Sequence, residues 1–262
     1  MSGIRLVTRA DDAGMHPSAN RAIRDTVIHG IVRNISLMAP APAIRNAFEY
    51  LGDLGDRVDF GLHVTLTSEW QALRWRPLIG DRASGFARGD GTMCATVSEL
   101  RALEPDADAM MAEVAAQYDL LAGMGFELGY LDVHMGADDL PGLAERLESF
   151  AQERGLVNNR VLFASGSVDR LPGWNGPGEH PGTELADHLA QVPAGTYLLV
   201  GHPVMKDESL HQIRLDGQPA GEVMMERNRQ RRMFMDIEIV DYCENVEIEL
   251  LRYTRIGAST RS

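Results

Sequence analysis

Short apolar, β-rich segments alternate with longer helical patterns along the chain, and this alternation constrains the fold more than any other feature. The strand segments are too apolar for a sheet that leaves one face in water. Strands buried on both faces are typical of parallel sheets covered by helices, so we expect an α/β fold with a mostly parallel sheet. The expected strands lie at 4–9, 32–39, 58–67, 128–135, 160–165, 196–202 and 246–253.

Helical patterns fill the connections between these strands. Ser18 is a plausible N-cap of the first helix and Gly30 a plausible stop. About seven strand–helix units favour a TIM-like distorted (β/α) barrel, with a doubly wound sheet as the alternative. The 262 residues suit one barrel, so we expect a single domain over 1–262. The expected helices lie at 18–30, 42–53, 95–125 with a break at Pro105, 140–155 and 221–243.

Charge and composition exclude several classes of function. The formal net charge of −13 argues against binding to nucleic acid or to anionic membranes, because both need basic patches. Two distant cysteines, Cys94 and Cys243, fit neither a disulfide framework nor a cysteine zinc site. The sequence has neither an apolar signal core at the N-terminus nor an apolar run long enough to span a membrane. We therefore expect a soluble, cytoplasmic protein.

Polar residues stand where four of the expected strands end, which is where barrel enzymes carry their active sites. Each has an ordinary structural explanation when taken alone: two acids before a glycine suit a turn, and a histidine in an apolar run is often a hydrogen-bonded core residue. Together, a carboxylate and two imidazoles form a common ligand set for Zn²⁺ or another divalent ion. These residues are Asp11, Asp12, His63, Asp132, His134 and His202.

Several familiar motifs are absent from the sequence. It contains no GxxxxGK[ST] phosphate loop, no GxGxxG after the first strand, no GxSxG elbow and no HExxH. The first strand leads into acids, which would repel a nucleotide phosphate. Two long irregular stretches, 68–94 and 166–182, interrupt the alternation, and long loops in α/β folds are often functional.

Four segments resemble one known family. TRADDAGMHPSANRAI, GLHVTLT, YLDVHM and LLVGHP are similar, in order, to segments of the YdjC-like (ChbG/HpnK-type) carbohydrate deacetylases. The resemblance spans nearly the whole chain. It implies a seven-stranded, TIM-like distorted barrel and hydrolysis of an N-acetyl group from an amino sugar in an oligosaccharide or glycolipid. It also implies a homodimer.

The resemblance assigns roles residue by residue. Asp12, His63 and His134 would hold a divalent metal ion, Mg²⁺ or Zn²⁺. Asp11 would be the general base that activates the attacking water, and His202 the general acid or oxyanion partner. We also expect some loop residues to contact the sugar, and one acid to orient a metal-binding imidazole, as weaker candidates. These residues are Trp70, Trp75, Arg76 and Trp174 for the sugar, and Asp132 for the imidazole.

The chain also departs from the family pattern. Arg9 stands where the family usually has Asn, Ala13 where it has Phe, and Val204 where it has Gly. The segment after His134 reads MGADD, without the further histidines that the family carries there. These departures leave two alternatives open. One is a catalytically altered metal- or carbohydrate-binding protein on the same scaffold, and the other is a hydrolase of a different amide or of a phosphoester.

Overall fold

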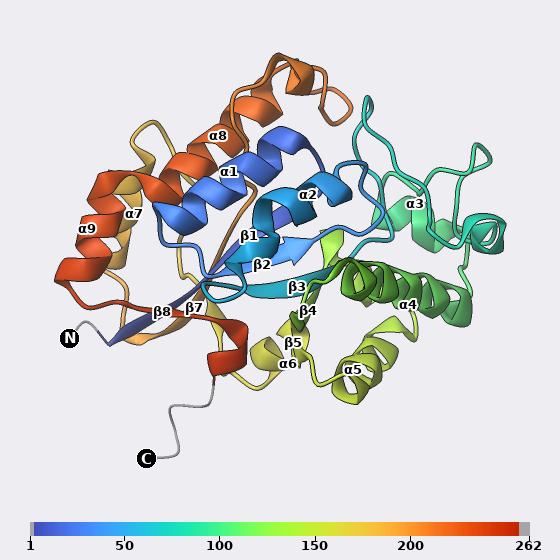
Figure 1. Ribbon diagram of the computed structural model, residues 1–262, viewed down its shortest axis with the longest axis horizontal. Coiled ribbons are helices and arrows are strands. Elements are labelled where there is room, and N and C mark those ends of the chain that lie inside the picture. The colour runs from blue at the N-terminus through green and yellow to red at the C-terminus, as the bar shows by residue number, and fades with distance from the viewer. Residues whose placement is uncertain (1–2, 257–262) are drawn as a thin grey trace.

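A parallel sheet that curls into a half-barrel forms the centre of the molecule (Figure 1). The computed structural model describes residues 3–256; residues 1–2 and 257–262 of the predicted 1–262 domain lie outside them. The eight strands are β1 (Ile4–Ala13), β2 (Asn34–Leu37), β3 (Asp59–Val64), β4 (Leu128–Val133), β5 (Val157–Asn158), β6 (Asp169–Arg170), β7 (Gly195–Gly201) and β8 (Glu249–Leu251). Seven follow the order β5-β4-β3-β2-β1-β7-β6, β8 pairs with β1, and every pairing is parallel. The predicted distorted barrel of about seven parallel strands is confirmed.

Strand β1 lies at the centre of the sheet, and all of its residues except Arg5 are buried. It pairs with β7 along Ile4–Ala10, while β8 and β2 pair with its first and second halves. The register with β2 shifts between Ala10 and Ala13. Asp12 lies within this irregularity with a φ of 63°, a conformation that a non-glycine residue rarely adopts. Such irregularities re-aim side chains and are frequent beside active sites.

The barrel is open between its two shortest strands. Strands β5 and β6 have two residues each and stand at the two ends of the strand order. Within the described part of the chain they do not pair with each other. We call this gap between β5 and β6 the seam.

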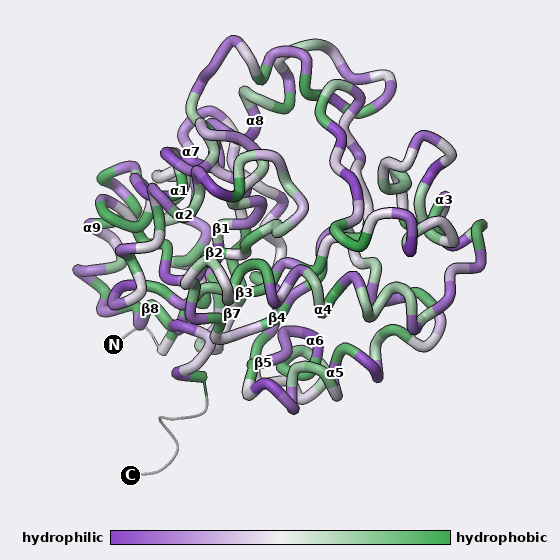
Figure 2. The backbone as a smooth tube through the Cα atoms, turned by 45° about the vertical axis from the view of Figure 1, so that its right-hand side comes forward, coloured by the Kyte–Doolittle hydropathy of each residue, from purple (hydrophilic) through white to green (hydrophobic). Residues whose placement is uncertain are grey.

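Helices cover the outer side of the sheet (Figure 1). Figure 2 shows hydrophilic and hydrophobic segments alternating along the helices that surround the sheet. Among residues 3–256, no helix combines the length and the apolar character that a membrane span requires. The helices are α1 (Pro17–Ile28), α2 (Ile44–Leu51), α3 (Val97–Ala102), α4 (Ala107–Met124), α5 (Leu143–Glu153), α6 (Asn159–Ala164), α7 (Pro181–Leu189), α8 (Glu222–Met235) and α9 (Ile237–Asn245).

The strand expected at 160–165 is wrong. That segment is helix α6, and the strand at this place, β5, is only Val157–Asn158. The side chain of Asn158 accepts a hydrogen bond from the backbone N–H of Arg160 and so caps the helix. Short apolar runs suit a strand or a helix equally well, so periodicity could not separate the two.

Two helix boundaries also differ from the prediction. The helix expected over 221–243 is broken at Asp236, whose ψ of 140° is not helical, so α8 and α9 are separate. Helix α1 is capped by His16 rather than Ser18: Nδ1 of His16 accepts a hydrogen bond from the backbone N–H of Ser18. Pro17 at the first helical position fits this earlier start.

Candidate active site

Three side chains converge at the carboxyl edge of the sheet, from β1, β3 and the residue after β4. Oδ1 of Asp12 lies 3.6 Å from Nε2 of His63 and 3.5 Å from Nδ1 of His134. The two ring nitrogens are 3.2 Å apart. All three residues are buried, and the Asp12 oxygens accept no well-formed hydrogen bond. Three donor atoms that face one another in this way fit a single divalent cation.

A carboxylate stands behind each imidazole. Nδ1 of His63 lies 2.7 Å from Oδ2 of Asp132, and Nε2 of His134 lies 2.9 Å from Oε2 of Glu69. Carboxylates only accept, so each imidazole donates an N–H outward and directs its other nitrogen toward Asp12. Metal-ligating histidines commonly have such partners, which fix the tautomer and the ring orientation.

Charge compensation keeps Asp12 ionised. Burial opposes its charge, but Arg227 on α8, with Nη1 2.7 Å from Oδ2, and the neighbouring imidazoles hold the pKa of Asp12 well below its usual range. Burial likewise opposes the charge of His63, but Asp132 and Asp12 together raise the pKa of His63 to about 10. Without an added cation, the cluster therefore holds a proton on His63 at neutral pH.

Asp11 is held by the residue that departs from the family pattern. Arg9 donates two hydrogen bonds to the Asp11 carboxylate, from Nε at 2.6 Å and from Nη2 at 2.8 Å. It also lies 3.2 Å from Asp132 and donates to the hydroxyl of Tyr253 at 2.9 Å. Each carboxylate oxygen has a second lone pair, so Asp11 can still accept a proton.

His202, directly after β7, lines the same cavity as the cluster. Its backbone N–H donates to Oε1 of Gln230 on α8 at 2.6 Å, and its Nδ1 lies 3.1 Å from the same oxygen. Nδ1 therefore carries the hydrogen, and Nε2 is left as an acceptor. Burial lowers the pKa of His202 below its usual value, so the ring is neutral at pH 7.

The cavity above the cluster has a volume of about 380 Å³. Charged and apolar residues both line it, and Trp70 lies beneath the guanidinium of Arg227, whose Cζ is 4.9 Å from the ring centroid. The lining residues are Asp11, Asp12, His63, Glu69, Trp70, Val133, His134, Met135, His202, Leu215, Gln218, Val223, Glu226, Arg227 and Gln230.

The other predicted sugar contacts lie elsewhere. Arg76 is exposed and is not among the residues that line this cavity. Trp75 is buried behind His134, and its indole N–H donates to the backbone of Thr67. Trp174 lines a different cavity, at the seam.

Two of the positions that depart from the family pattern, Ala13 and Val204, are buried beneath the active-site cavity. Ala13 belongs to the main hydrophobic core, and Val204 is buried in a smaller apolar cluster with Trp70 and Trp75. Neither lines the cavity. The departure with direct contacts to site residues is therefore Arg9.

Sequence patterns missed Glu69, Arg227 and Gln230. Glu69 is the second residue after the expected third strand, 58–67, and this position close to a strand end is a signal that could have found it. Arg227 and Gln230 belong to a helix rich in charged residues, where nothing distinguishes them from their neighbours. Their importance arises only because α8 packs close to the ends of β1 and β7.

A second group of candidate ligands, Asp11, His63 and Asp132, fits a cation less well. The guanidinium of Arg9 already contacts both carboxylates of this group. A metal ion there would have to share them with a positive charge, whereas Asp12 has an oxygen free for the cation.

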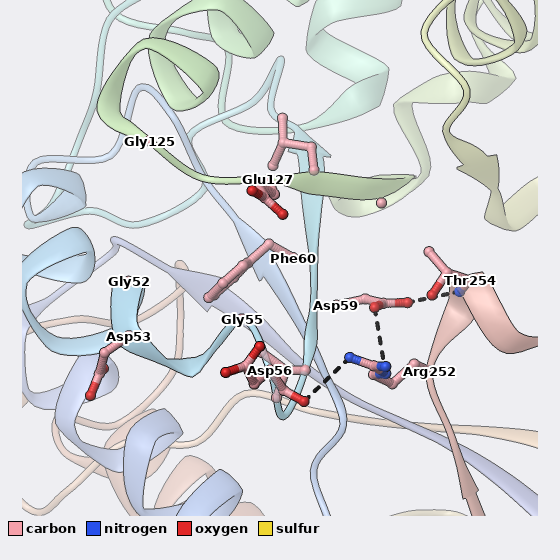
Figure 3. A pocket seen from close by; sticks show the side chains of 13 residues that line it. Gly52, Asp53, Gly55, Asp56, Asp59, Phe60, Gly125, Glu127, Arg252 and Thr254 are labelled. Atoms are coloured by element: carbon pink, nitrogen blue, oxygen red, sulfur yellow. Dashed lines mark hydrogen bonds and ion pairs between the residues drawn. The ribbon is translucent and has the colours of Figure 1, made fainter.

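The opposite edge of the sheet carries another polar cavity, of about 540 Å³ (Figure 3). Within it, Asp59 accepts a hydrogen bond from the backbone N–H of Thr254 at 2.7 Å and lies 3.8 Å from Arg252. Asp59 begins β3, while His63 is near the end of that strand. In barrels of this kind, residues at the amino edge of the strands contribute to stability and catalytic residues lie at the carboxyl edge. We therefore assign the catalytic site to the carboxyl edge.

Fold and site together define a parallel α/β half-barrel protein with a buried Asp–His–His cluster at the carboxyl edge of its sheet. The chain belongs to the YdjC-like protein family, whose sequence model matches residues 5–245. The resemblance noted from four short segments is thereby confirmed.

Curated relatives match over most of the chain. Carbohydrate deacetylase 1 of Listeria innocua is 23% identical over 264 residues, covering 95% of this chain and 99% of the relative. A carbohydrate deacetylase of Vibrio cholerae is 28% identical over 150 residues, covering 57% of this chain and 56% of the relative. A crystal structure from Enterococcus faecalis V583, of a protein named for cellobiose-phosphate cleavage, has the same fold. Its TM-score is 0.76 at 17% identity, with 95% of this chain and 97% of that chain covered.

Proposed function

We propose that this chain is a metal-dependent carbohydrate deacetylase that removes the N-acetyl group of an amino sugar. The observation that carries the proposal is the Asp12–His63–His134 cluster, with its three donor atoms 3.2–3.6 Å apart and a carboxylate behind each imidazole. The names of the curated relatives support the same activity. Two imidazoles and one carboxylate suit Zn²⁺ better than Mg²⁺, which prefers oxygen ligands.

The proposed mechanism divides the work among the residues that line the cavity. A bound divalent ion would act as a Lewis acid that polarises the acetyl carbonyl and makes water a better nucleophile. Asp11 accepts the proton that the attacking water loses, while Arg9 keeps its carboxylate in place. His202 is neutral in the free protein, so its Nε2 takes up a proton from solvent and gives it to the departing amine, while Asp11 returns to solvent the proton that it took from the attacking water.

Hydrolysis of a phosphoester fits the same cavity less well. It would need cationic side chains with charge to spare for the phosphate. Arg227 is paired with Asp12, and Arg9 is paired with Asp11 and Asp132. Neither guanidinium offers an uncompensated charge, so a neutral amide is the better substrate.

The test measures metal content and acetate release from a panel of N-acetylated amino sugars. Asp12→Ala should lose both, because it removes a ligand. Asp11→Asn keeps the size of the side chain and leaves Asp12, His63 and His134 in place, so it should keep the metal and lose turnover by 10²-fold or more.

Two outcomes would contradict the proposal in different ways. An Asp11→Asn variant with an intact rate means that Asp11 is not the base. A wild-type protein that binds metal but releases no acetate from any member of the panel favours the alternative, a binding protein on the same scaffold.

A further inference from the structure

The side chain of Gln230, on α8, accepts two hydrogen bonds from His202, the proposed general acid. Oε1 of Gln230 lies 2.6 Å from the backbone nitrogen of His202 and 3.1 Å from Nδ1 of its ring. Within residues 3–256, the other ring nitrogen, Nε2, has no hydrogen-bond partner, and the ring lines the active-site cavity. Gln230 therefore engages Nδ1 and leaves Nε2 free to react with a bound substrate.

Two contacts fix the orientation of the Gln230 amide. A backbone N–H can only donate, so the amide atom that faces the backbone nitrogen of His202 must be the oxygen. The amide nitrogen, Nε2, donates to Oε1 of Glu226 at 3.2 Å, and a carboxylate can only accept. Glu226 precedes Gln230 by one helical turn, the spacing at which side chains on a helix meet. Both contacts select the same orientation, so the amide oxygen stays turned toward the imidazole.

With the amide oxygen fixed, only one tautomer of the neutral His202 ring fits. The oxygen is an acceptor, so Nδ1 must carry the hydrogen. The other tautomer would set the lone pair of Nδ1 against the lone pairs of the oxygen. When Nε2 takes up a proton, the bond from Nδ1 to the oxygen is kept. Gln230 thus holds the ring in one place before and after it gains the proton that the departing amine receives.

The backbone on both sides of the proposed general acid is fixed without Gln230. Gly201, the last residue of β7, packs so closely on α8 that an added Cβ would lie 2.6 Å from Cε2 of Phe234. Further along the chain, Nδ2 of Asn228 on α8 donates to the backbone oxygen of Val204 at 3.0 Å. Loss of the Gln230 amide should therefore release the imidazole ring while the backbone keeps its place.

We propose that Gln230 is a positioning residue for proton transfer to the leaving group, and that Glu226 holds it in the productive orientation. This inference rests on the proposed deacetylase function and adds two residues to it. When the C–N bond breaks, the nitrogen keeps the electron pair and takes the proton of Nε2, because an unprotonated amine anion is too basic to leave. A nitrophenolate leaves with the electron pair of its C–O bond and needs no proton. Loss of Gln230 should therefore slow amide hydrolysis more than ester hydrolysis.

The test compares an acetyl amide with an acetyl ester. The amide probe is the N-acetylated amino sugar that the wild type hydrolyses fastest, starting from N-acetylglucosamine, and the ester probe is 4-nitrophenyl acetate. Asp12→Ala is the blank for hydrolysis outside the site. Gln230→Met keeps an unbranched side chain and loses the acceptor, so it should lower the amide-to-ester ratio of kcat by about tenfold. The KM of the amide should stay within about twofold, because no contact to the substrate is removed. Gln230→Glu keeps an oxygen acceptor and should recover most of the ratio.

Two further variants sharpen the comparison. Asn228→Ala is the matched control on α8: it removes a hydrogen bond to the segment after His202 without touching the ring, so the ratio should not change. Glu226→Ala should lower the ratio by a smaller factor than Gln230→Met, because the backbone N–H of His202 still selects the amide oxygen. A Gln230→Met variant that loses amide and ester turnover equally, or neither, would overturn the positioning role. An unchanged ratio in Glu226→Ala would exclude Glu226 from it.

A spectroscopic measurement separates failure of this inference from failure of the proposed function. In the metal-free protein, two-bond ¹H–¹⁵N correlations distinguish the two neutral tautomers of an imidazole, and the signal lost in His202→Ala identifies the ring. The wild type should show the Nδ1–H tautomer, and Gln230→Met should shift the ring toward the Nε2–H tautomer, which an unconstrained imidazole prefers. An Nε2–H tautomer in the wild type would overturn the inference even if the enzyme releases acetate. An Nδ1–H tautomer that depends on Gln230, without acetate release, would retain the pairing and overturn the deacetylase.

Discussion

Each imidazole of the Asp12–His63–His134 cluster is oriented by a carboxylate. Glu69 offers the cleaner test, because among the described residues its side chain pairs with His134 alone, whereas Asp132 also contacts Arg9. Glu69→Ala should weaken Zn²⁺ binding by about 10- to 100-fold, because His134 loses the acceptor that fixes its ring. Glu69→Gln should lose less, since its amide oxygen still accepts the imidazole N–H. Competition with a chromophoric chelator measures both variants. Equal affinities of the wild type and Glu69→Ala would exclude an orienting role.

Proton release on metal binding follows from the charge on His63. The folded-state pKa of about 10 lies above the ordinary value of 6.5. The protonated ring therefore stabilises the metal-free protein fully below about pH 6.5, and this contribution is lost as the pH rises through about 10. A divalent cation needs the lone pair of Nε2 and must displace the proton.

At pH 7.5, Zn²⁺ binding should therefore release about one proton from His63. Calorimetric titrations in two buffers with different ionisation enthalpies measure this release. Identical binding enthalpies in the two buffers would mean that no proton leaves the protein.

The candidate ligand residues could be predicted individually because each stands at a strand end in an apolar context. Asp12, His63 and His134 were found in this way, and the structure brings them together. Glu69 was overlooked although it lies close to a strand end, and Arg9 was noted only as a departure from the family pattern, because its hydrogen bonds to Asp11 cannot be read from sequence position. Arg76 was predicted near the sugar from its residue type and its place in the loop after the third strand, and it does not line the cavity.

At the scale of elements, helix α8 closes one side of the active site through an ion pair with strand β1. Arg227 on α8 is buried and compensates the charge of Asp12. Arg227→Ala would leave a buried carboxylate without its nearest cation, which should lower the free energy of unfolding of the metal-free protein by about 3 kcal/mol.

Adding Zn²⁺ should reduce the stability loss of Arg227→Ala, because the ion supplies positive charge at the Asp12 carboxylate. Urea unfolding with and without metal measures the effect, and Arg229→Ala on the same helix is the control, expected to change stability by less than about 0.5 kcal/mol. An Arg227→Ala variant as stable as the wild type without metal would contradict the assigned pairing.

Secondary structure could be predicted best where segments are long and periodic. The longer strands and helices α4 and α5 lie where apolar spacing indicated. The segment at 160–165 and the break at Asp236 were missed because local capping and backbone geometry decided them. Strand β6 has only two residues, too short for any periodicity to be visible.

The whole molecule depends on contacts that join distant parts of the chain. Tyr253, near the end of the described residues, donates to Asn159 and accepts from Arg9, while Asn34 donates to the backbone of Leu251. These contacts fix the last strand against the first. No pattern in the sequence reveals them, because they follow from how the sheet curls. The homodimer implied by the family resemblance stays a prediction.

The most direct test of the account is a crystal structure of the Zn²⁺-loaded protein with anomalous diffraction recorded at the zinc edge. We expect one strong anomalous peak within bonding distance of Oδ1 of Asp12, Nε2 of His63 and Nδ1 of His134. A peak bound by other residues, or the absence of a peak at these three atoms after loading, would contradict it.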